Sequence, residues 1–146
     1  MAKVLIVYAT RKNATQKIGE IIAEGIRFSD HEVKVVNVKD IKSEDDLNGY
    51  DAYVFGSATY HGDMMQGMKT FLFLAENAEL QNKIGASFGA FGWSGEASGR
   101  IFDTMENIFQ MDMVGGPLML KSSRLGGGIN MAQDYGREIA GKLMAS

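Results

Sequence analysis

The sequence predicts an α/β fold in which helices cover both faces of a parallel β-sheet. Short apolar or β-branched runs alternate along the chain with longer segments whose apolar residues recur at helical spacing. Such a repeating strand–helix order is typical of parallel strands joined by right-handed crossovers. The runs Val4–Val7 and Val33–Val36 are continuously or almost continuously apolar, which indicates strands buried on both faces.

Five short runs are predicted as strands because each is rich in apolar residues and is bounded by Gly, Asn, Asp or Lys. In chain order they are Lys3–Tyr8, Val33–Val38, Ala52–Ser57, Ile84–Phe91 and Met113–Leu120. The segment Ile41–Leu47 is short and acidic, so we expect only a turn or a single helical turn there.

Four segments are predicted as helices because each offers one apolar stripe to a sheet. The stripes are Ile18, Ile21, Ile22 and Ile26; Met68, Phe71, Leu72 and Leu74; Ile101, Met105, Ile108 and Phe109; and Tyr135, Ile139, Ala140 and Leu143.

Five strands of this kind can form a doubly wound sheet in the order 2-1-3-4-5, whose ligand crevice opens beyond the carboxyl ends of the first and third strands. A (β/α)₈ barrel would need eight such units, for which the chain is too short. In the predicted order, three loops meet at one edge of the sheet, formed by residues 9–15, 57–63 and 89–96.

Composition limits the classes of function that the chain can have. Its 146 residues, 45% hydrophobic and 23% charged, suit a single domain spanning residues 1–146. It has no cysteine, which excludes disulfides, iron–sulfur clusters and cysteine nucleophiles. With no membrane-length apolar run and a net charge of −3, we expect a cytoplasmic protein that neither inserts into membranes nor binds nucleic acid.

The first of the three loops has the features of a phosphate site. The apolar strand ending at Tyr8 leads into Thr10, and Thr15 follows at the start of a helical pattern. A helix N-terminus offers unpaired amide groups and roughly half a positive charge, so it binds a phosphate readily. Thr10 and Thr15 would add hydroxyl donors at the two ends of the loop.

At these residues the chain resembles the flavodoxin family, and the resemblance extends over essentially its whole length. Thr10 and Thr15 match the family's Ser/Thr-x-Thr-Gly-Asn-Thr phosphate loop, in which Lys12, Asn13 and Ala14 replace the usual Thr, Gly and Asn. The resemblance implies a flavodoxin-like three-layer α/β/α sandwich with a five-stranded parallel sheet in the order 2-1-3-4-5. It also implies that this loop holds the phosphate of FMN, through Thr10, Arg11, Lys12, Asn13, Ala14 and Thr15.

The second loop is similar to the family's loop that lays an aromatic ring beside the isoalloxazine, and Tyr60 is the candidate for that ring. The family often follows this aromatic residue directly with Gly, whereas here His61 stands between Tyr60 and Gly62. The cofactor-binding residues implied in this loop are Ser57, Ala58, Thr59, Tyr60, His61 and Gly62.

The third loop closely resembles that of the flavodoxin-like domain of A-type (flavodiiron) flavoproteins. Trp93 would form the second aromatic wall, and glycines at positions 89, 92 and 95 would let the backbone approach a flat ring. The residues implied here are Phe88, Gly89, Ala90, Phe91, Gly92, Trp93 and Gly95. With only His31 and His61 in the chain, no metal site is predicted.

The resemblance implies an electron-transfer protein that binds FMN, shuttles one or two electrons between a reductase and an acceptor protein, and has no catalytic residues of its own. We expect it to be a monomer or a weak dimer. The alternative is a small FMN-dependent oxidoreductase acting on NAD(P)H and a quinone, or on a protoporphyrinogen-type substrate. A third possibility is a flavin-free interaction module that keeps the fold.

Overall fold

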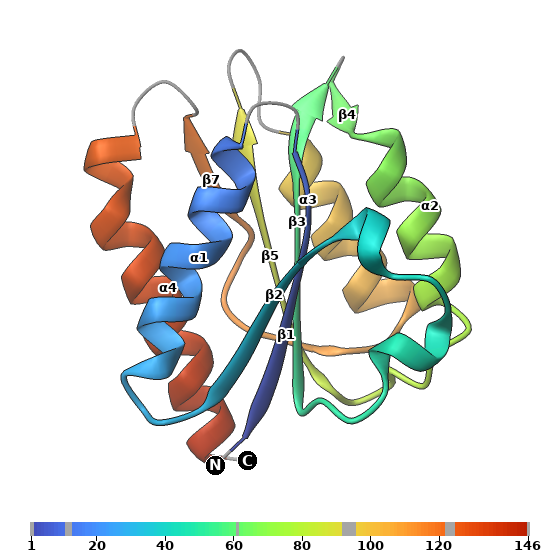
Figure 1. Cartoon of the computed structure of the whole chain (residues 1–146), viewed down its shortest axis with the longest axis horizontal. Coiled ribbons are helices and arrows are strands. Elements are labelled where there is room, and N and C mark those ends of the chain that lie inside the picture. Colours follow the sequence, from blue (N-terminus) through green and yellow to red (C-terminus); the bar gives the residue numbers. More distant parts are fainter. Residues whose placement is uncertain (1, 11–12, 61, 92–95, 122–124, 146) are drawn as a thin grey trace.

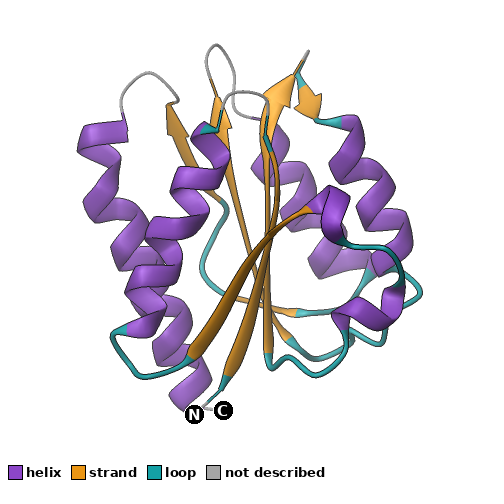
Figure 2. Cartoon of the chain, in the orientation of Figure 1, coloured by secondary structure: helices purple, strands orange, loops and turns teal. Residues whose placement is uncertain are grey.

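A parallel sheet runs through the middle of the molecule, with two helices on each face (Figures 1 and 2). The computed structural model describes residues 2–10, 13–60, 62–91, 96–121 and 125–145. The sheet has the order β2-β1-β3-β5-β6, so the α/β class and the predicted strand order are confirmed. The strands are β1 (Lys3–Ala9), β2 (Glu32–Asn37), β3 (Ala52–Tyr60), β4 (Asp63–Met64), β5 (Ile84–Phe91), β6 (Asp112–Met113) and β7 (Leu118–Lys121).

The number of strands differs from the five predicted, because the last one is interrupted and a short one is added. Instead of one strand over Met113–Leu120, β6 and β7 pair separately with β5. Between them Gly115 has a φ of 51° and Pro117 has no amide hydrogen to donate, so the ladder stops there. The two-residue β4 pairs with β3, and it makes the sheet seven-stranded.

A side chain from the last helix fills the gap between β6 and β7. The Tyr135 hydroxyl lies 3.0 Å from the Ser87 carbonyl oxygen and 2.9 Å from that of Gly116, and it accepts a 3.3 Å hydrogen bond from the Ser87 amide. Burial raises the pKa of Tyr135 above its usual value of 10.0. The neutral phenol therefore supplies hydrogen bonds that a continuous fifth strand would have supplied.

The prediction that Val33–Val36 would be buried on both faces is wrong. Strand β1 is buried from Val4 to Ala9, but no residue of β2 is fully buried: Glu32 and Lys34 are exposed, and the other four residues are half-buried. The reason is position in the sheet: β1 has β2 and β3 as neighbours, whereas β2 is the edge strand and pairs with β1 alone.

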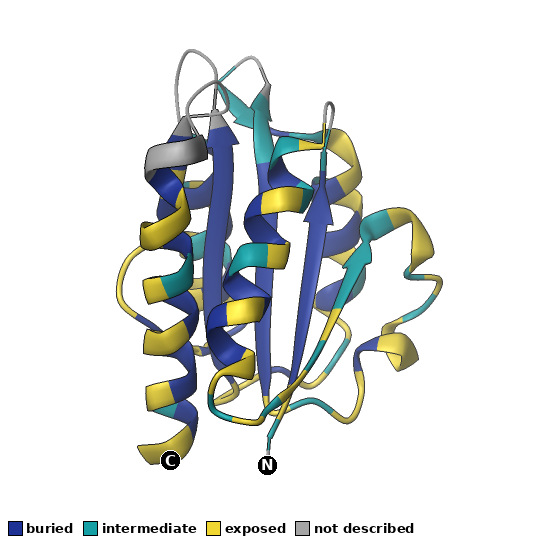
Figure 3. Cartoon of the chain, turned by 60° about the vertical axis from the view of Figure 1, so that its left-hand side comes forward, coloured by how far each residue is buried: buried dark blue, intermediate teal, exposed yellow. Residues whose placement is uncertain are grey.

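Each face of the sheet has its own hydrophobic core. Helices α1 (Ala14–Arg27) and α4 (Leu125–Ala145) cover one face, and α2 (Gln66–Ala75) and α3 (Glu96–Asp103) cover the other. Figure 3 shows the result for α1 and α4, which turn a buried stripe to the sheet and an exposed stripe outward. The acidic segment forms a single short 3₁₀ turn, η2 (Glu44–Leu47), as predicted; another, η1 (Val38–Asp40), precedes it.

Two glycines bring α1 and α4 into backbone contact. A β-carbon on Gly136 would lie 2.2 Å from the carbonyl oxygen of Ile22, and one on Gly25 would lie 2.2 Å from that of Gln133. No side chain fits at either position, so the two helices can pack this closely only because both residues lack a β-carbon.

The third predicted helix changes geometry part-way along. After α3 the chain forms one π-helical turn, η3 (Thr104–Ile108), in which the Phe109 amide donates to the Thr104 carbonyl. A π turn contains more residues than an α turn, so the side chains beyond it are rotated about the axis. Met105 and Phe109 are buried as predicted, but Ile108 is exposed instead of lying on the apolar stripe.

Candidate functional site

The carboxyl ends of β1, β3 and β5 lie side by side at one edge of the sheet (Figure 1). Ala9 of β1 pairs with Ser57, and Ser57 in turn pairs with Gly89 of β5. The three candidate segments therefore follow strand ends that meet at one edge of the sheet, as the sequence predicted.

The N-terminus of α1 opens toward this edge (Figure 1). Asn13 has a left-handed conformation (φ 66°, ψ 0°), and its carbonyl accepts the first helical hydrogen bond, 3.1 Å from the Lys17 amide. Helix geometry leaves the amides of Ala14, Thr15 and Gln16 without an intrahelical acceptor. Together with the helix dipole, these amides favour an anion at this position.

Two hydroxyl groups at the same turn are buried and unsatisfied. Thr15 is 0% exposed, and neither its Oγ1 atom nor that of Thr10 has a hydrogen-bond partner within the described residues. A buried hydroxyl without a partner costs about 1–3 kcal/mol, so such groups are rare in native structures. An anion with several oxygen acceptors, such as a phosphate, would satisfy both hydroxyls.

The distribution of unsatisfied atoms distinguishes this edge from the opposite one. Of the four such buried side-chain atoms found in the described chain, three belong here, on Thr10, Thr15 and Ser98. An open cavity of ≈ 420 Å³ adjoins Thr10 and Asn13. Larger hollows of ≈ 530 and ≈ 600 Å³ border His31 at the other edge, toward which α1 points its carboxyl end, with partial negative charge. Cavity volume alone would therefore favour the opposite edge of the sheet, where the end of α1 disfavours a phosphate.

The second segment is a β-hairpin rather than a loop. Strand β3 continues three residues beyond the predicted end at Ser57, and Tyr60 pairs with Asp63 of β4. Gly62 has a φ of 74°, a conformation that glycine adopts without steric cost. The hairpin carries the backbone of Tyr60 past the end of the main sheet.

Side-chain hydroxyls attach this hairpin to the surrounding helices. Ser57 Oγ donates to the Ala58 carbonyl (2.9 Å) and accepts a hydrogen bond from the Met65 amide (3.0 Å). Thr59 Oγ1 accepts a hydrogen bond of 3.1 Å from the Ala97 amide at the start of α3. Ser57 and Thr59 therefore position the hairpin.

An ion-pair cluster lies beside the hairpin. The Asp63 carboxylate is 2.6 Å from Lys69 Nζ and 3.6 Å from Arg100 Nε, so it links β4 to both α2 and α3. The hydrogen bond from Lys69 is the main reason that the pKa of Asp63 lies below its usual value. A β-carbon on Gly62 would lie 3.4 Å from a Glu96 carboxylate oxygen, so a second carboxylate borders the turn.

The third segment supports the site mainly through packing. Phe88 is fully buried, and a β-carbon on Gly56 would lie 2.3 Å from its ring, so this side chain belongs to the core and cannot contact a ligand at the edge. At Gly89 a β-carbon would come within 2.9 Å of the Ser57 carbonyl oxygen and 3.2 Å of Ser98 Cβ. Gly89 therefore allows close packing between α3 and the sheet, and the Ala90 side chain is buried.

Ser98 is the polar residue of this edge that the sequence analysis missed. It is fully buried in the first turn of α3, its carbonyl accepts a 2.9 Å hydrogen bond from Ser87 Oγ, and its own Oγ has no partner among the described residues. The available signal was a small polar residue in the first turn of a helix that follows a glycine-rich segment.

Several predicted site residues lie outside the described part of the structure. They are Arg11, Lys12, His61, Gly92, Trp93 and Gly95, together with the side chains of Tyr60 and Phe91.

Comparison with known proteins assigns the family. A sequence model of the flavodoxin domain matches residues 5–114. The chain belongs to the flavodoxin family. This match covers β1 through β6, and so includes all three segments that converge at the carboxyl edge.

Relatives of this flavodoxin-family chain are both small flavodoxins and larger proteins. It is 29% identical to the rubredoxin-oxygen oxidoreductase of Megalodesulfovibrio gigas over 98% of the chain, and 34% identical to the flavodoxin of Maridesulfovibrio salexigens over 61%. The alignments span only 37% and 63% of these relatives. A solved flavodoxin from the domain Archaea superposes with a TM-score of 0.87 at 29% identity, covering 97% of this chain and 99% of that one.

In the ranges that the structure describes, no three or more His, Asp or Glu side chains gather in a way that could hold a metal ion. Over the same ranges, no helix has the length and apolar character needed to cross a membrane.

Proposed function

We propose that this chain binds FMN at the carboxyl edge of the sheet and carries electrons between redox proteins. The observation that carries the proposal is the pair of buried, unpartnered hydroxyls of Thr10 and Thr15 at the N-terminus of α1. The names of its relatives support the same function, since they include flavodoxins and two kinds of redox enzyme.

The first segment binds the FMN phosphate. The hydroxyl groups of Thr10 and Thr15 donate hydrogen bonds to phosphate oxygens, and the amides at the start of α1 donate hydrogen bonds to the other phosphate oxygens. Hydrogen bonds to a charged group contribute about 1.5–3 kcal/mol each, more than bonds between neutral groups. The partial positive charge of the helix N-terminus adds to this attraction without requiring a basic side chain.

The second and third segments bind the isoalloxazine. FMN, when bound, supplies the redox chemistry, because it accepts and donates one or two electrons. The chain holds the hairpin in place through the bonds of Ser57 and Thr59, and Tyr60 lies at the end of that hairpin. Gly89 allows α3 to pack against β5, which fixes the start of the third segment.

On the hairpin side of the proposed site, acidic and basic side chains nearly balance each other. Asp63 is paired with Lys69 and Arg100, so this carboxylate adds little net negative charge next to the hairpin. Fixed charges near a redox group favour the oxidation state of opposite sign. Cytoplasmic location and a monomeric or weakly dimeric state stay predictions from the sequence.

The experiment that tests the proposal is a titration of the flavin-free protein with FMN and, in parallel, with riboflavin, which lacks the phosphate. We expect FMN to bind at least about a hundred-fold more tightly, because two charge-assisted hydrogen bonds are worth at least about 3 kcal/mol. Binding is followed by quenching of flavin fluorescence and by the visible spectrum. Equal affinity for both flavins contradicts the phosphate assignment, and failure to bind either contradicts the whole proposal.

A second measurement separates an electron carrier from an enzyme. The FMN-loaded protein is reduced by a flavin-dependent reductase and mixed with an acceptor protein, and NAD(P)H oxidation with a quinone is measured separately. A carrier passes electrons to the acceptor and shows no quinone-dependent turnover. Rapid turnover with NAD(P)H and quinone contradicts the carrier.

A further inference from the structure

The cavity at the carboxyl edge is lined partly by residues outside the three predicted segments. Its volume is ≈ 420 Å³, and Thr10 and Asn13 line it next to the N-terminus of α1. Asn37 and Lys39 line it at the end of β2 and in η1, and Gly67 lines it at the start of α2. The end of β2 and the start of α2 therefore border the place that the proposed function assigns to the FMN phosphate.

The charge in this cavity is positive. Lys39 is the single charged residue among the described residues that line it, and none of them is a carboxylate. Within the described ranges no carboxylate lies at ion-pair distance from Lys39 Nζ either. The described structure therefore leaves the charge of Lys39 uncompensated beside an unpartnered hydroxyl, that of Thr10.

Neither helix that begins beside the cavity has an acidic residue in its first turn, and no described side chain caps the N-terminus of α1 or α2. Acidic residues are favoured at that position because they complement the partial positive charge of the helix end, and capping side chains accept hydrogen bonds from its free amides. At α1 the fully buried Thr15 hydroxyl also lacks a partner within the described residues. An external anion would complement both the charge and the donors at these helix ends.

Local contacts hold the backbone of Lys39 in the wall of the cavity. Its amide donates a 3.2 Å hydrogen bond to Asn37 Oδ1, and its carbonyl accepts one of 2.8 Å from Lys42 Nζ. On the other side, a β-carbon on Gly67 would lie 3.3 Å from Val38 Cγ2, so the start of α2 packs directly against η1. The backbone of Lys39 is thus anchored, while its amine has no acceptor among the described residues.

We propose that Lys39 makes the site selective for a doubly charged phosphate, with its ammonium group against the outer oxygens of the phosphate that Thr10 and Thr15 bind. This inference rests on the proposed function, since it takes FMN as the ligand. A phosphate monoester carries about two negative charges at neutral pH, whereas a helix N-terminus supplies about half a positive charge. Lys39 supplies one full positive charge toward the remainder.

The test compares three flavins that differ only in the group at the end of the ribityl chain. FMN carries a phosphate dianion, riboflavin 5′-sulfate carries a monoanion of similar shape, and riboflavin carries a neutral hydroxyl. Their Kd values for the flavin-free full chain are measured by fluorescence quenching at low ionic strength. We expect Lys39→Gln to raise the Kd about fivefold for FMN and about twofold for the sulfate, and to leave that for riboflavin unchanged. Added salt should reduce the effect on FMN.

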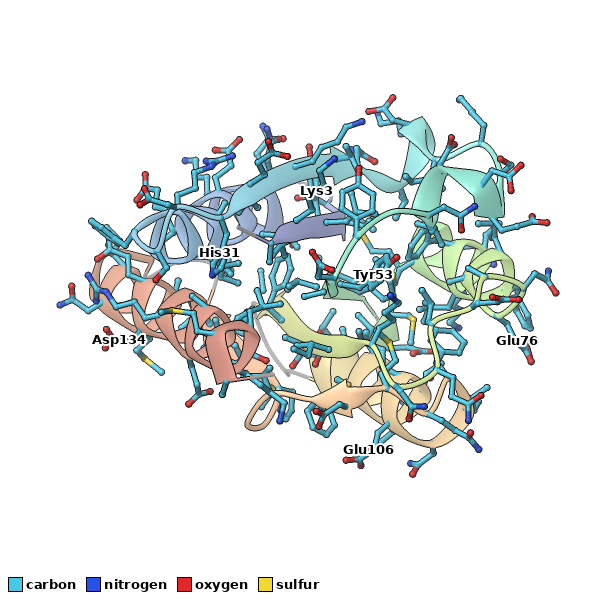
Figure 4. All side chains as sticks on the ribbon, turned by 90° about the horizontal axis from the view of Figure 1, so that it is seen from below. Lys3, His31, Tyr53, Glu76, Glu106 and Asp134 are labelled. Carbon is cyan, nitrogen blue, oxygen red and sulfur yellow. The ribbon has the colours of Figure 1, made fainter. Side chains whose placement is uncertain are left out.

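Two control variants separate the charge of Lys39 from its structural contacts. Lys39→Arg keeps the positive charge, so it should bind FMN within about twofold of the wild type. Lys34→Gln removes the same charge from β2, but Lys34 lines a different cavity together with Lys3 and His31, at the opposite edge of the sheet, which Figure 4 shows. This variant should leave all three Kd values unchanged.

Three results would overturn the inference about Lys39. They are an equal loss of affinity for FMN and riboflavin in Lys39→Gln, an equal effect of Lys39→Gln and Lys34→Gln on FMN, and a loss in Lys39→Arg as large as that in Lys39→Gln. In each case a wild-type preference for FMN over riboflavin still supports the phosphate assignment. Absence of that preference in the wild type contradicts the proposed function itself, so the two failures can be told apart.

Discussion

Replacing Thr15 with valine should strengthen the flavin-free protein and weaken FMN binding at the same time. Valine has nearly the same shape as threonine and a similar helix propensity, so packing changes little. What changes is a hydroxyl that is completely buried and has no partner in the described structure. In the free protein this hydroxyl is a cost, and with phosphate bound it is a hydrogen-bond donor.

The two effects have opposite signs and can be estimated separately. Removing an unsatisfied buried hydroxyl should stabilise the free protein by about 1 kcal/mol, the lower end of the desolvation range. For a chain of this size that raises the melting temperature by about 3 °C. Losing a hydrogen bond to a charged phosphate costs about 1.5–3 kcal/mol, so the Kd for FMN should rise about 10- to 150-fold.

Urea unfolding of the flavin-free protein measures the change in its stability, and fluorescence titration measures the change in the Kd for FMN. Riboflavin provides an internal control, because its affinity should not depend on a phosphate donor. Thr104→Val is the matched variant: its Oγ1 already donates to the Arg100 carbonyl (2.9 Å), and it lies away from the edge. That change should leave FMN binding unaltered and should not stabilise the protein.

Two results would refute the reasoning about Thr15. If Thr15→Val destabilised the free protein by more than about 1 kcal/mol, the hydroxyl would have a structural partner. If FMN and riboflavin affinities fell by the same factor, the residue would act on the ring or on folding and not on the phosphate.

Three further predictions concern stability. Gly136→Ala should destabilise the protein by about 3 kcal/mol, because its β-carbon would meet the Ile22 carbonyl at 2.2 Å. Gly141 lies on the same helix with open space around it, so Gly141→Ala should stabilise the protein by about 1 kcal/mol, as measured by urea unfolding. The raised pKa of Tyr135 means that the fold favours the neutral phenol, so the free energy of unfolding should fall as pH rises above about 10. The variant Tyr135→Phe should be about 1–3 kcal/mol less stable than the wild type at pH 7, but its free energy of unfolding should not show this decrease at alkaline pH. Because the pKa of Asp63 lies below its usual value of 3.8 in the folded protein, the ionised carboxylate stabilises the fold above pH 3.8, and this stabilisation is lost as the pH falls below that value. In thermal melts, Asp63→Asn should therefore lose less stability at acid pH than the wild type does, by less than about 1 kcal/mol.

The strand order followed from the sequence because it depends on a repeated pattern. Alternation of apolar runs and helical stripes leaves few topologies for five parallel strands, and the observed order agrees. The exposure of β2 was missed, although the run Val33–Val36 includes the charged Lys34, which the entirely apolar run Val4–Val7 has no counterpart for. Edge position is a property of the whole sheet, and the local sign of it in this run was that lysine, a residue type common on edge strands.

Local irregularities were harder to predict because they depend on single residues. The break between β6 and β7 coincides with Gly115 and Pro117, a signal that was present but was overridden by the apolar residues on either side. The π turn after α3 has no such signal, and it moved Ile108 from the expected core to the surface. A helical periodicity argument assumes a constant number of residues per turn and fails wherever that number changes.

The candidate site was predicted at the level of segments and less well at the level of side chains. Ser57, Phe88 and Gly89 were all expected to contact the cofactor. In the structure Phe88 fills the core, whereas Ser57 also positions the hairpin and Gly89 also allows α3 to pack closely, and their contacts with a cofactor stay predictions. A family motif marks both the ligand contacts and the packing that holds them in place. Only the three-dimensional contacts separate the two kinds of residue.

Asn13 shows how the predicted phosphate loop can lead into α1 although its sequence departs from that of the family. The family's usual residue at this position is glycine, and Asn13 has a φ of 66°, in the left-handed region that most side chains avoid. Asparagine is one of the few residues that adopt this conformation routinely, because its short polar side chain tolerates it. The amides at the start of α1 are oriented by this backbone conformation and not by the side chain, so the substitution is compatible with the proposed anion site. Asn13 therefore has the left-handed backbone conformation that a glycine would adopt readily, and asparagine is among the non-glycine residues best able to supply it.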